Sequence, residues 1–240
     1  MTRKYWYGPV QSRRLGRSLG VDVMPLKTCS LDCVYCECGA TNSLTLERKE
    51  YFPIDEIIGS LDEILKEKPD LDFITFAGSG EPTLHTGLGK IISFIKEKYP
   101  HYKVAVLTNA TLLNDPAVIA DIEKADLVVP SLDAVSAEIF EKINRPVKNI
   151  TPETIISGIK NLKNSFKGDI WLEIFIIPGI NDQDEELALF KDTINKLGIK
   201  KVQLNTLDRP GAVDWLKPVS KEYKEKIASK LGNVEIVNRV

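Results

Sequence analysis

The stretch Cys29-Ser-Leu-Asp-Cys33-Val-Tyr-Cys36 is the part of the sequence from which the fold and the chemistry are inferred. Its cysteines are spaced four and then three positions apart, and Cys38 follows closely. A short loop with this spacing can wrap its thiolates around one iron–sulfur cluster, because iron in a cluster prefers soft thiolate ligands. Three protein ligands on a four-iron cluster leave one iron open for a small chelating molecule. We therefore expect Cys29, Cys33 and Cys36 to be cluster ligands.

Two other uses of these cysteines are a structural zinc site and a disulfide framework. Zinc sites usually pair one CxxC with a second CxxC or a pair of histidines much further along. Here the cysteines are crowded, and His85 and His101 are both distant from them. A disulfide framework is typical of short secreted chains, whereas this sequence has 240 residues and no apolar signal core near its N-terminus. The sequence favours the cluster over both.

The composition is that of a soluble globular protein, with 43% apolar and 28% charged residues. A net charge of −2 gives no global attraction to nucleic acid. No apolar run is long enough to span a membrane, so we expect a cytoplasmic protein with reduced thiols. We expect one domain over residues 1–240. Residues 1–19 form a basic and aromatic arm, either solvated on the surface or binding an anion, with the cations Arg3, Lys4, Arg13, Arg14 and Arg17.

Short apolar runs alternate along the chain with amphipathic segments, which predicts buried strands alternating with helices. The predicted strands are Leu19–Met24, Phe73–Phe76, Val104–Leu107, Leu127–Val129, Ile170–Ile177 and Val202–Leu204, with a last edge strand at Val234–Val237. The predicted helices are Pro53–Glu67, Leu88–Tyr99, Pro116–Lys124, Ala137–Ile143, Thr151–Asn164, Asp184–Leu197 and Lys221–Leu231.

This order predicts an α/β fold, a parallel sheet with helices outside, wound in one direction by right-handed crossovers. Six units rather than eight favour a partial (β/α)6 TIM-type barrel that is open at one side, although periodicity alone does not distinguish it from a flat doubly wound sheet. The carboxyl ends of parallel strands share one face, and that face holds the site. Polar or glycine-rich loops follow the strands there: the cysteine loop, Gly78–Pro82, Thr108–Asn109, Ser131–Asp133, Pro178–Asp182 and Asn205–Gly211.

The segment after the second predicted strand, Gly78-Ser-Gly80-Glu81-Pro82, has two interpretations. Gly78 and Gly80 would let the backbone approach a ligand closely, and Glu81 would offer a carboxylate to a ligand ammonium group. The same residues also suit an ordinary Gly-Pro turn.

Short polar side chains follow the next two strands. Thr108, Asn109 and Ser131 would hold a carboxylate or a ribose at the strand ends. Asp133 suits a ribose ligand or a helix cap. Each of these residue types is also common in turns.

The CxxxCxxC spacing, with the aromatic Tyr35 just before the last cysteine, resembles the radical S-adenosylmethionine (radical SAM) superfamily. The resemblance implies a six-unit partial barrel, a [4Fe-4S] cluster and S-adenosylmethionine (SAM), whose amino and carboxylate groups bind the open iron. It implies cleavage of SAM to methionine and a 5′-deoxyadenosyl radical, with electrons from a flavodoxin- or ferredoxin-type donor.

The resemblance also assigns roles to individual residues. Gly78–Glu81 resembles the GGE motif that holds the SAM amine, lengthened here by Ser79. Tyr35, Gly179 and Ile180 match positions near the adenine. Thr108, Asn109, Ser131 and Asp133 match positions that contact the methionyl carboxylate and the ribose.

The sequence leaves the substrate open among RNA, protein and small molecules. The chain is similar to a group related to the wyosine tRNA-modifying enzymes, although it has no cysteine before Cys29 for their second cluster. It is also similar in size to glycyl-radical activating enzymes. Arg145 and Arg209 would bind a substrate anion or form surface ion pairs. Cys38 is a spare small residue or faces the substrate. An electron carrier and a zinc protein remain the alternatives from other classes.

Overall fold

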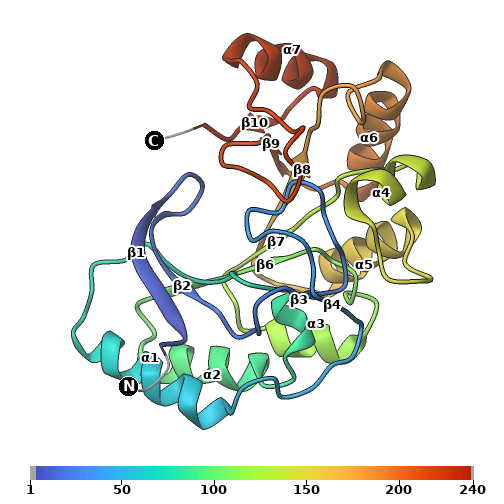
Figure 1. Ribbon diagram of the computed structural model, residues 1–240. Helices are drawn as coiled ribbons and strands as arrows, with labels where there is room; N and C mark the ends of the chain where they lie inside the picture. Colours follow the sequence, from blue (N-terminus) through green and yellow to red (C-terminus); the bar gives the residue numbers. More distant parts are fainter. Residues whose placement is uncertain (1–3, 239–240) are drawn as a thin grey trace.

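The computed structural model describes residues 4–238, so Arg3 of the expected basic arm lies outside the described part. One curved sheet has the strand order β1-β2-β5-β6-β7-β8-β9-β10. Figure 1 shows that the sheet is curved, with the helices on its outer face and with its two edge strands left unjoined. Its strands are β1 (Trp6–Ser12), β2 (Gly16–Val21), β5 (Phe73–Phe76), β6 (Lys103–Thr108), β7 (Leu127–Pro130), β8 (Asp169–Phe175), β9 (Lys201–Asn205) and β10 (Glu235–Ile236).

Every strand pairs in parallel with its neighbour from β2 to β10, as the βα alternation predicts. The predicted fold of parallel strands with helices outside, forming a barrel that does not close, is confirmed. The helices are α1 (Ile54–Lys66), α2 (Leu88–Lys98), α3 (Pro116–Ile122), α4 (Ala137–Asn144), α5 (Pro152–Ser165), α6 (Asp184–Leu197) and α7 (Lys221–Leu231), with a 3-10 turn η1 (Pro82–Leu84).

Local sequence explains where the helices begin and end. The Thr151 side chain caps α5 by accepting a hydrogen bond from the Thr154 amide, and Pro152 occupies the first turn. α6 ends at Gly198, whose left-handed φ of 59° stops the helix. Inward residues of α1, such as Ile57, Leu61 and Leu65, are fully buried against the outer face of the sheet. These contacts fix the sheet whose strand ends carry the site.

Residues 4–19 differ from the expected arm. Residues 6–12 form β1, which pairs antiparallel with β2 and makes a hairpin at the edge of the sheet. β2 itself begins at Gly16 and ends at Val21, earlier than the predicted Leu19–Met24. Its strand character is not evident from the sequence, because the consecutive residues 7–11 are all exposed and show no alternation of apolar and polar side chains. The hairpin lies across the open side of the sheet (Figure 1).

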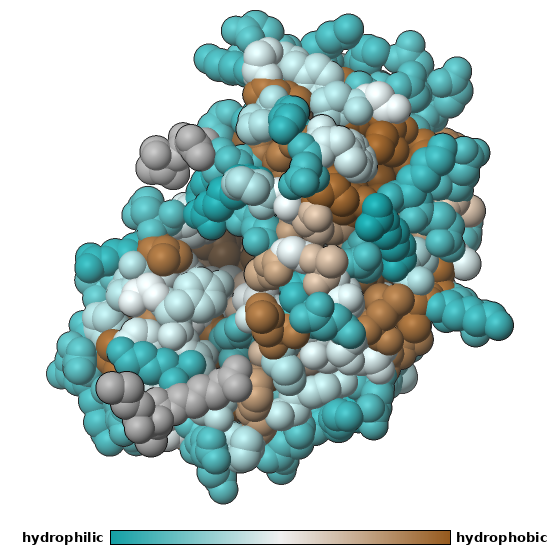
Figure 2. Space-filling view, viewed as in Figure 1, coloured by the Kyte–Doolittle hydropathy of each residue, from teal (hydrophilic) through white to brown (hydrophobic). Residues whose placement is uncertain are grey.

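The two faces of the sheet carry different residues. Leu172 and Ile174 of β8 belong to the main core beneath the helices, whereas Trp171 packs on the concave face beside Ala105 and Leu127. The concave face is partly polar, since Ser18 and Thr75 share a hydrogen bond of 2.6 Å there. Figure 2 shows the molecule hollowed on this side, with apolar surface in the depth and hydrophilic side chains around it. Among the described residues, no helix is long and apolar enough to cross a bilayer.

Candidate active site

The cysteine loop is held at the carboxyl ends of the strands by backbone hydrogen bonds. The Val34 amide donates to the Ile143 carbonyl at 2.9 Å, and the Asp32 amide donates to the Asn144 carbonyl at 2.9 Å. Two short strands, β3 (Thr28–Cys29) and β4 (Ser43–Leu44), pair in parallel at the two ends of the loop. The loop is thus fixed against the end of α4 before any ligand binds.

Each of the three predicted ligand sulfurs has one nitrogen donor from a different part of the chain. The donors come from the residue two before Cys29, from the end of β6 and from the end of α4. Lys27 Nζ lies 3.0 Å from Cys36 Sγ, Asn109 Nδ2 lies 3.4 Å from Cys29 Sγ, and Asn144 Nδ2 lies 3.3 Å from Cys33 Sγ. Such donors orient thiolate ligands and tune the metal that they hold.

The thiols share one electrostatic environment. Burial raises the pKa of Cys29 to about 11, with the Glu81 charge adding to the effect. Burial also raises the pKa of Cys33 well above its usual value, and the charges of Cys29 and Cys36 raise it further. The pKa of Cys36 falls to about 5, because Cys38 and then Lys27 donate hydrogen bonds to it. Burial thus favours the protonated forms of Cys29 and Cys33, and a bound metal would be needed to hold both as thiolates.

A single metal ion fits the described residues poorly. Within residues 4–238, no group of three or more His, Cys, Asp or Glu side chains closes around one ion. The zinc interpretation therefore gains no support from the geometry. The three thiols come from one loop, their charges influence one another's pKa, and each lies near a side-chain nitrogen donor, so the residues present fit an iron–sulfur cluster.

Glu81 is buried behind the loop and is bonded entirely to the protein. Its Oε1 accepts hydrogen bonds from the amide and hydroxyl of Thr83 at 3.1 and 2.6 Å and from the Thr108 hydroxyl at 2.7 Å. Its Oε2 accepts from the Asn109 amide at 2.8 Å. Burial raises the pKa of Glu81 and is the largest of the influences on that pKa. The carboxylate thus joins η1 to the end of β6, and through Asn109 it positions a donor to Cys29.

Asp133 is likewise buried, and it connects the aromatic residue of the cysteine loop to the end of β8 and to the end of α4. Its Oδ2 accepts from the Tyr35 hydroxyl at 2.5 Å and from Asn144 Nδ2 at 2.8 Å. Its Oδ1 accepts from the Phe175 amide at 3.2 Å. Tyr35 stacks on Phe175 with ring centroids 3.9 Å apart. Asp133 does not cap α4, whose N-cap residue is Ser136.

The two glycines before Glu81 occur where a side chain would not fit. Gly80 approaches the Thr28 carbonyl so closely that a Cβ would lie 2.0 Å from its oxygen. Gly78 has a φ of 145°, and a Cβ there would press on the Asp22 side chain. The segment therefore packs its backbone directly against the start of the cysteine loop.

The remaining predicted residues lie on the same side of the sheet. Ser131 forms a bridge with Glu173 of β8 and lines a small cavity together with Asn109 and Asp133. Ile180 packs in the apolar cluster that contains Tyr35 and Phe175. Gly179 is exposed, with a φ of 77°, and its amide donates to Asp182 rather than to the cysteine loop.

A comparison with protein families decides the superfamily. The profile of the radical SAM superfamily matches residues 23–190, which include the cysteine loop and the strands from β5 to β8. The chain belongs to the radical SAM superfamily. Members of this superfamily use a 4Fe-4S cluster and SAM. The resemblance inferred from Cys29, Cys33 and Cys36 is thereby confirmed.

Similar proteins are known in other organisms. This radical SAM chain is 41% identical over 220 residues to a Brachyspira hyodysenteriae protein named GTPase Obg, a match that covers 92% of the chain and 32% of that protein. It is 33% identical over 236 residues to a UPF0026 protein of Methanocaldococcus jannaschii, covering 98% of the chain and 73% of that protein. The chain therefore spans about a third of the first relative and most of the second.

Solved structures share the fold at low identity. A radical SAM methyltransferase from Sphaerobacter thermophilus superimposes with a TM-score of 0.67 at 16% identity, over 91% of this chain and 66% of the other. The structure of TYW1 with a lysine-pyruvate adduct bound gives a TM-score of 0.61 at 16% identity, over 90% of this chain and 72% of the other. At this identity the likeness concerns the fold alone.

Sequence reasoning missed several residues of this radical SAM site. Asn144, which contacts Cys33, was missed because the sequence drew attention to its neighbour Arg145. Arg145 pairs with Asp32 at 3.6 Å, near the surface. Lys27 lies just ahead of the cysteines and gave no separate signal. Glu173 did give a signal, because it is a charged residue inside the strongest apolar strand. It lies on the concave face, two positions after Trp171. It forms an ion pair with Arg14.

Proposed function

We propose that this chain is a radical SAM enzyme in which Cys29, Cys33 and Cys36 hold a 4Fe-4S cluster and SAM binds the open iron. When bound, the reduced cluster supplies the electron that splits SAM into methionine and a 5′-deoxyadenosyl radical, which takes a hydrogen atom from the substrate. One observation carries the proposal. Three thiols come from one short loop, their charges influence one another's pKa, and each lies near a different side-chain nitrogen donor.

The residues of the chain have defined tasks in this proposal. Lys27, Asn109 and Asn144 orient the sulfurs and stabilise their negative charge. Asp133 fixes Tyr35 and Asn144 together, so that the ring of the cysteine loop and a sulfur donor keep one geometry. Gly78 and Gly80 let the backbone of their segment pack directly against the start of the cysteine loop, next to the place where SAM would bind.

An outside protein must deliver the electron, and a flavodoxin- or ferredoxin-type donor has the required low potential. Free thiols at four positions also suit a reducing compartment such as the cytoplasm.

The proposal predicts that the anaerobically reconstituted chain makes 5′-deoxyadenosine when dithionite and SAM are supplied. Liquid chromatography of the quenched reaction measures this product, and iron and sulfide are determined on the same sample. Stoichiometric zinc without iron would establish a zinc protein instead. A cluster that reduces normally but yields no 5′-deoxyadenosine would support the electron-carrier alternative.

A further inference from the structure

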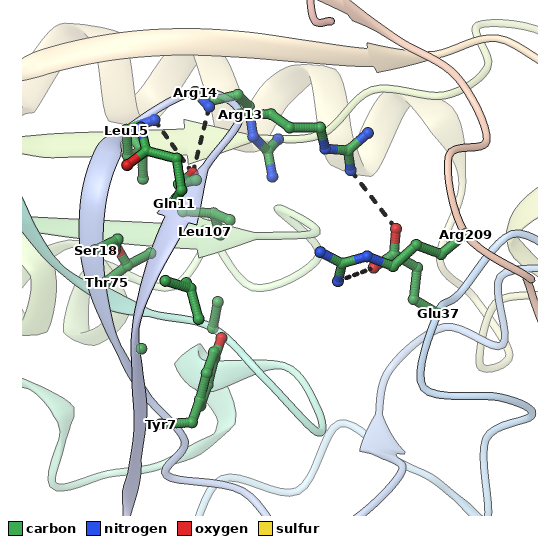
Figure 3. A pocket seen from close by; sticks show the side chains of 14 residues that line it. Tyr7, Gln11, Arg13, Arg14, Leu15, Ser18, Glu37, Thr75, Leu107 and Arg209 are labelled. Atoms are coloured by element: carbon green, nitrogen blue, oxygen red, sulfur yellow. Dashed lines mark hydrogen bonds and ion pairs between the residues drawn. The ribbon is translucent and has the colours of Figure 1, made fainter. Parts of the chain in front are cut away.

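A cavity of about 310 Å³ lies between the β1-β2 hairpin and the concave face of the sheet. Its depth is formed by short polar and apolar side chains, and its outer part by long charged ones (Figure 3). Gly20 and Ala77, at the ends of β2 and β5, belong to its wall. The lining includes Tyr7, Gln11, Arg13, Arg14, Ser18, Glu37, Thr75, Leu107 and Arg209.

Arginines dominate the lining of this cavity, although the chain as a whole has a net charge of −2. The lining contains the guanidinium groups of Arg13, Arg14 and Arg209 and one carboxylate, that of Glu37. Two further carboxylates, those of Glu173 and Asp208, pair with Arg14 and Arg13 from outside the lining. The cavity is therefore close to electrically neutral, and it binds an added anion only where an arginine exchanges its carboxylate partner.

Arg14 is held by Glu173 and is not available to bind an added anion. Its side chain is 16% exposed and forms an ion pair with Glu173, which reaches it from β8 across the concave face. Burial lowers the pKa of Arg14 to about 10, which leaves it cationic at neutral pH. The Glu173 carboxylate neutralises Arg14, so Arg13 and Arg209 are the cations that can exchange a carboxylate partner for an added anion.

Arg13 and Arg209 are bound loosely by a carboxylate that they share. Arg13 lies 3.6 Å from Glu37 and 3.6 Å from Asp208, longer than the roughly 2.7–2.9 Å of a charge-assisted hydrogen bond. Arg209 donates to Glu37 at 3.2 Å, and its side chain is 68% exposed. Two guanidinium groups, each with several donors, therefore share the partly exposed Glu37 carboxylate (Figure 3). Asp208 is a second and equally distant partner of Arg13 alone.

The three residues come from three separate segments. Arg13 belongs to the hairpin turn, Arg209 to the loop after β9, and Glu37 directly follows Cys36 in the cysteine loop. Their meeting point is therefore both the rim of the cavity and the edge of the cysteine loop. An anion bound there would lie between the substrate cavity and the place where the radical forms.

We propose that Arg13 and Arg209 together bind a carboxylate or phosphate group of a small anionic substrate, which displaces the Glu37 carboxylate from between them. The uncharged part of the substrate enters the depth lined by Ser18, Thr75 and Leu107. This assignment rests on the proposed radical SAM function and adds the charge of the substrate to it. A small molecule is favoured because the arginines face a cavity of about 310 Å³ rather than an open surface.

The test measures binding of inorganic pyrophosphate and of malonate to the full reconstituted chain by titration calorimetry at low ionic strength. We expect Arg13→Gln and Arg209→Gln each to weaken binding of at least one probe about tenfold, the size of one charge-assisted hydrogen bond. We expect Glu37→Gln to strengthen it, because the competing carboxylate is gone. Arg17→Gln is the matched control, since Arg17 has the same charge on the same hairpin but pairs with Asp70 outside the cavity.

Equal effects of the Arg13→Gln, Arg209→Gln and Arg17→Gln changes would overturn the proposal, because only general charge would then matter. Unchanged binding in Glu37→Gln would also overturn it. SAM carries a carboxylate too, so its affinity is measured in the same variants, and a loss equal to that of the probes would assign the arginines to SAM instead of the substrate. The parent chain is assayed for 5′-deoxyadenosine in parallel. Normal product with no probe effect would defeat only the anion site, and no product would defeat the radical SAM function.

Discussion

Replacing Cys36 with alanine is expected to abolish formation of 5′-deoxyadenosine and to leave the purified chain without a stable cluster. Cys36 Sγ is the thiol with the lowest pKa, about 5, and it has Lys27 Nζ at 3.0 Å. It is therefore the sulfur best prepared to bind iron as a thiolate. Iron and sulfide content and product formation are measured on parent and variant, reconstituted side by side.

Cys38→Ser is the matched control for this change. Cys38 lies two positions further along the same loop, is exposed, and donates the hydrogen bond that lowers the pKa of Cys36. A serine hydroxyl at this position retains the ability to donate. We expect the serine variant to keep its iron and sulfide. If Cys38→Ser lost the cluster while Cys36→Ala kept it, the assignment of the ligands would be wrong.

Replacing Glu81 with alanine is expected to destabilise the chain by about 2–6 kcal/mol, because it leaves the buried amides of Thr83 and Asn109 without their acceptor. Thermal unfolding followed by circular dichroism measures the change. The loss also frees Asn109, whose side chain donates to Cys29 Sγ, so cluster content should fall with stability. This is the largest stability effect that we expect from a single substitution at the site.

Glu81→Gln distinguishes a positioning role from direct contact with SAM. The amide keeps the shape and one acceptor oxygen of Glu81, so we expect an intermediate stability and a SAM affinity that changes in step with it. A variant with the stability of the parent but with most of its SAM affinity lost would contradict the positioning role. It would instead support the contact with the SAM amine that the Gly78–Glu81 motif implies.

Much of the fold follows from the sequence because its signals are local. The strand Ile170–Ile177 is apolar over most of its length, and the cap at Thr151 and the stop at Gly198 depend on their immediate neighbours. The hairpin strand at residues 6–12 was not predicted, because it is an edge strand that is exposed on both faces in its middle and has no apolar run. This strand pairs antiparallel with the outer edge of β2, at the open side of the sheet.

The candidate site, too, could be predicted from the sequence only where its signals are local. The spacing of the cysteines is local and names the superfamily, which the match over residues 23–190 confirms. The partners of those cysteines are not local, since Asn109 and Asn144 lie 80 and 111 positions from the sulfurs that they contact. Sequence also could not show that Glu81 and Asp133 are saturated by the chain's own donors. Burial and hydrogen bonding of these carboxylates depend on how four strand ends meet.

The central claim is that three sulfurs of one loop leave an iron open for SAM, and one measurement tests it most directly. The reduced cluster is examined by electron–nuclear double resonance in the presence of SAM labelled with 15N in its amino group and 17O in its carboxylate. The account predicts hyperfine coupling of both labels to the cluster in the parent chain. A reduced 4Fe-4S cluster that shows neither coupling under saturating SAM would contradict it.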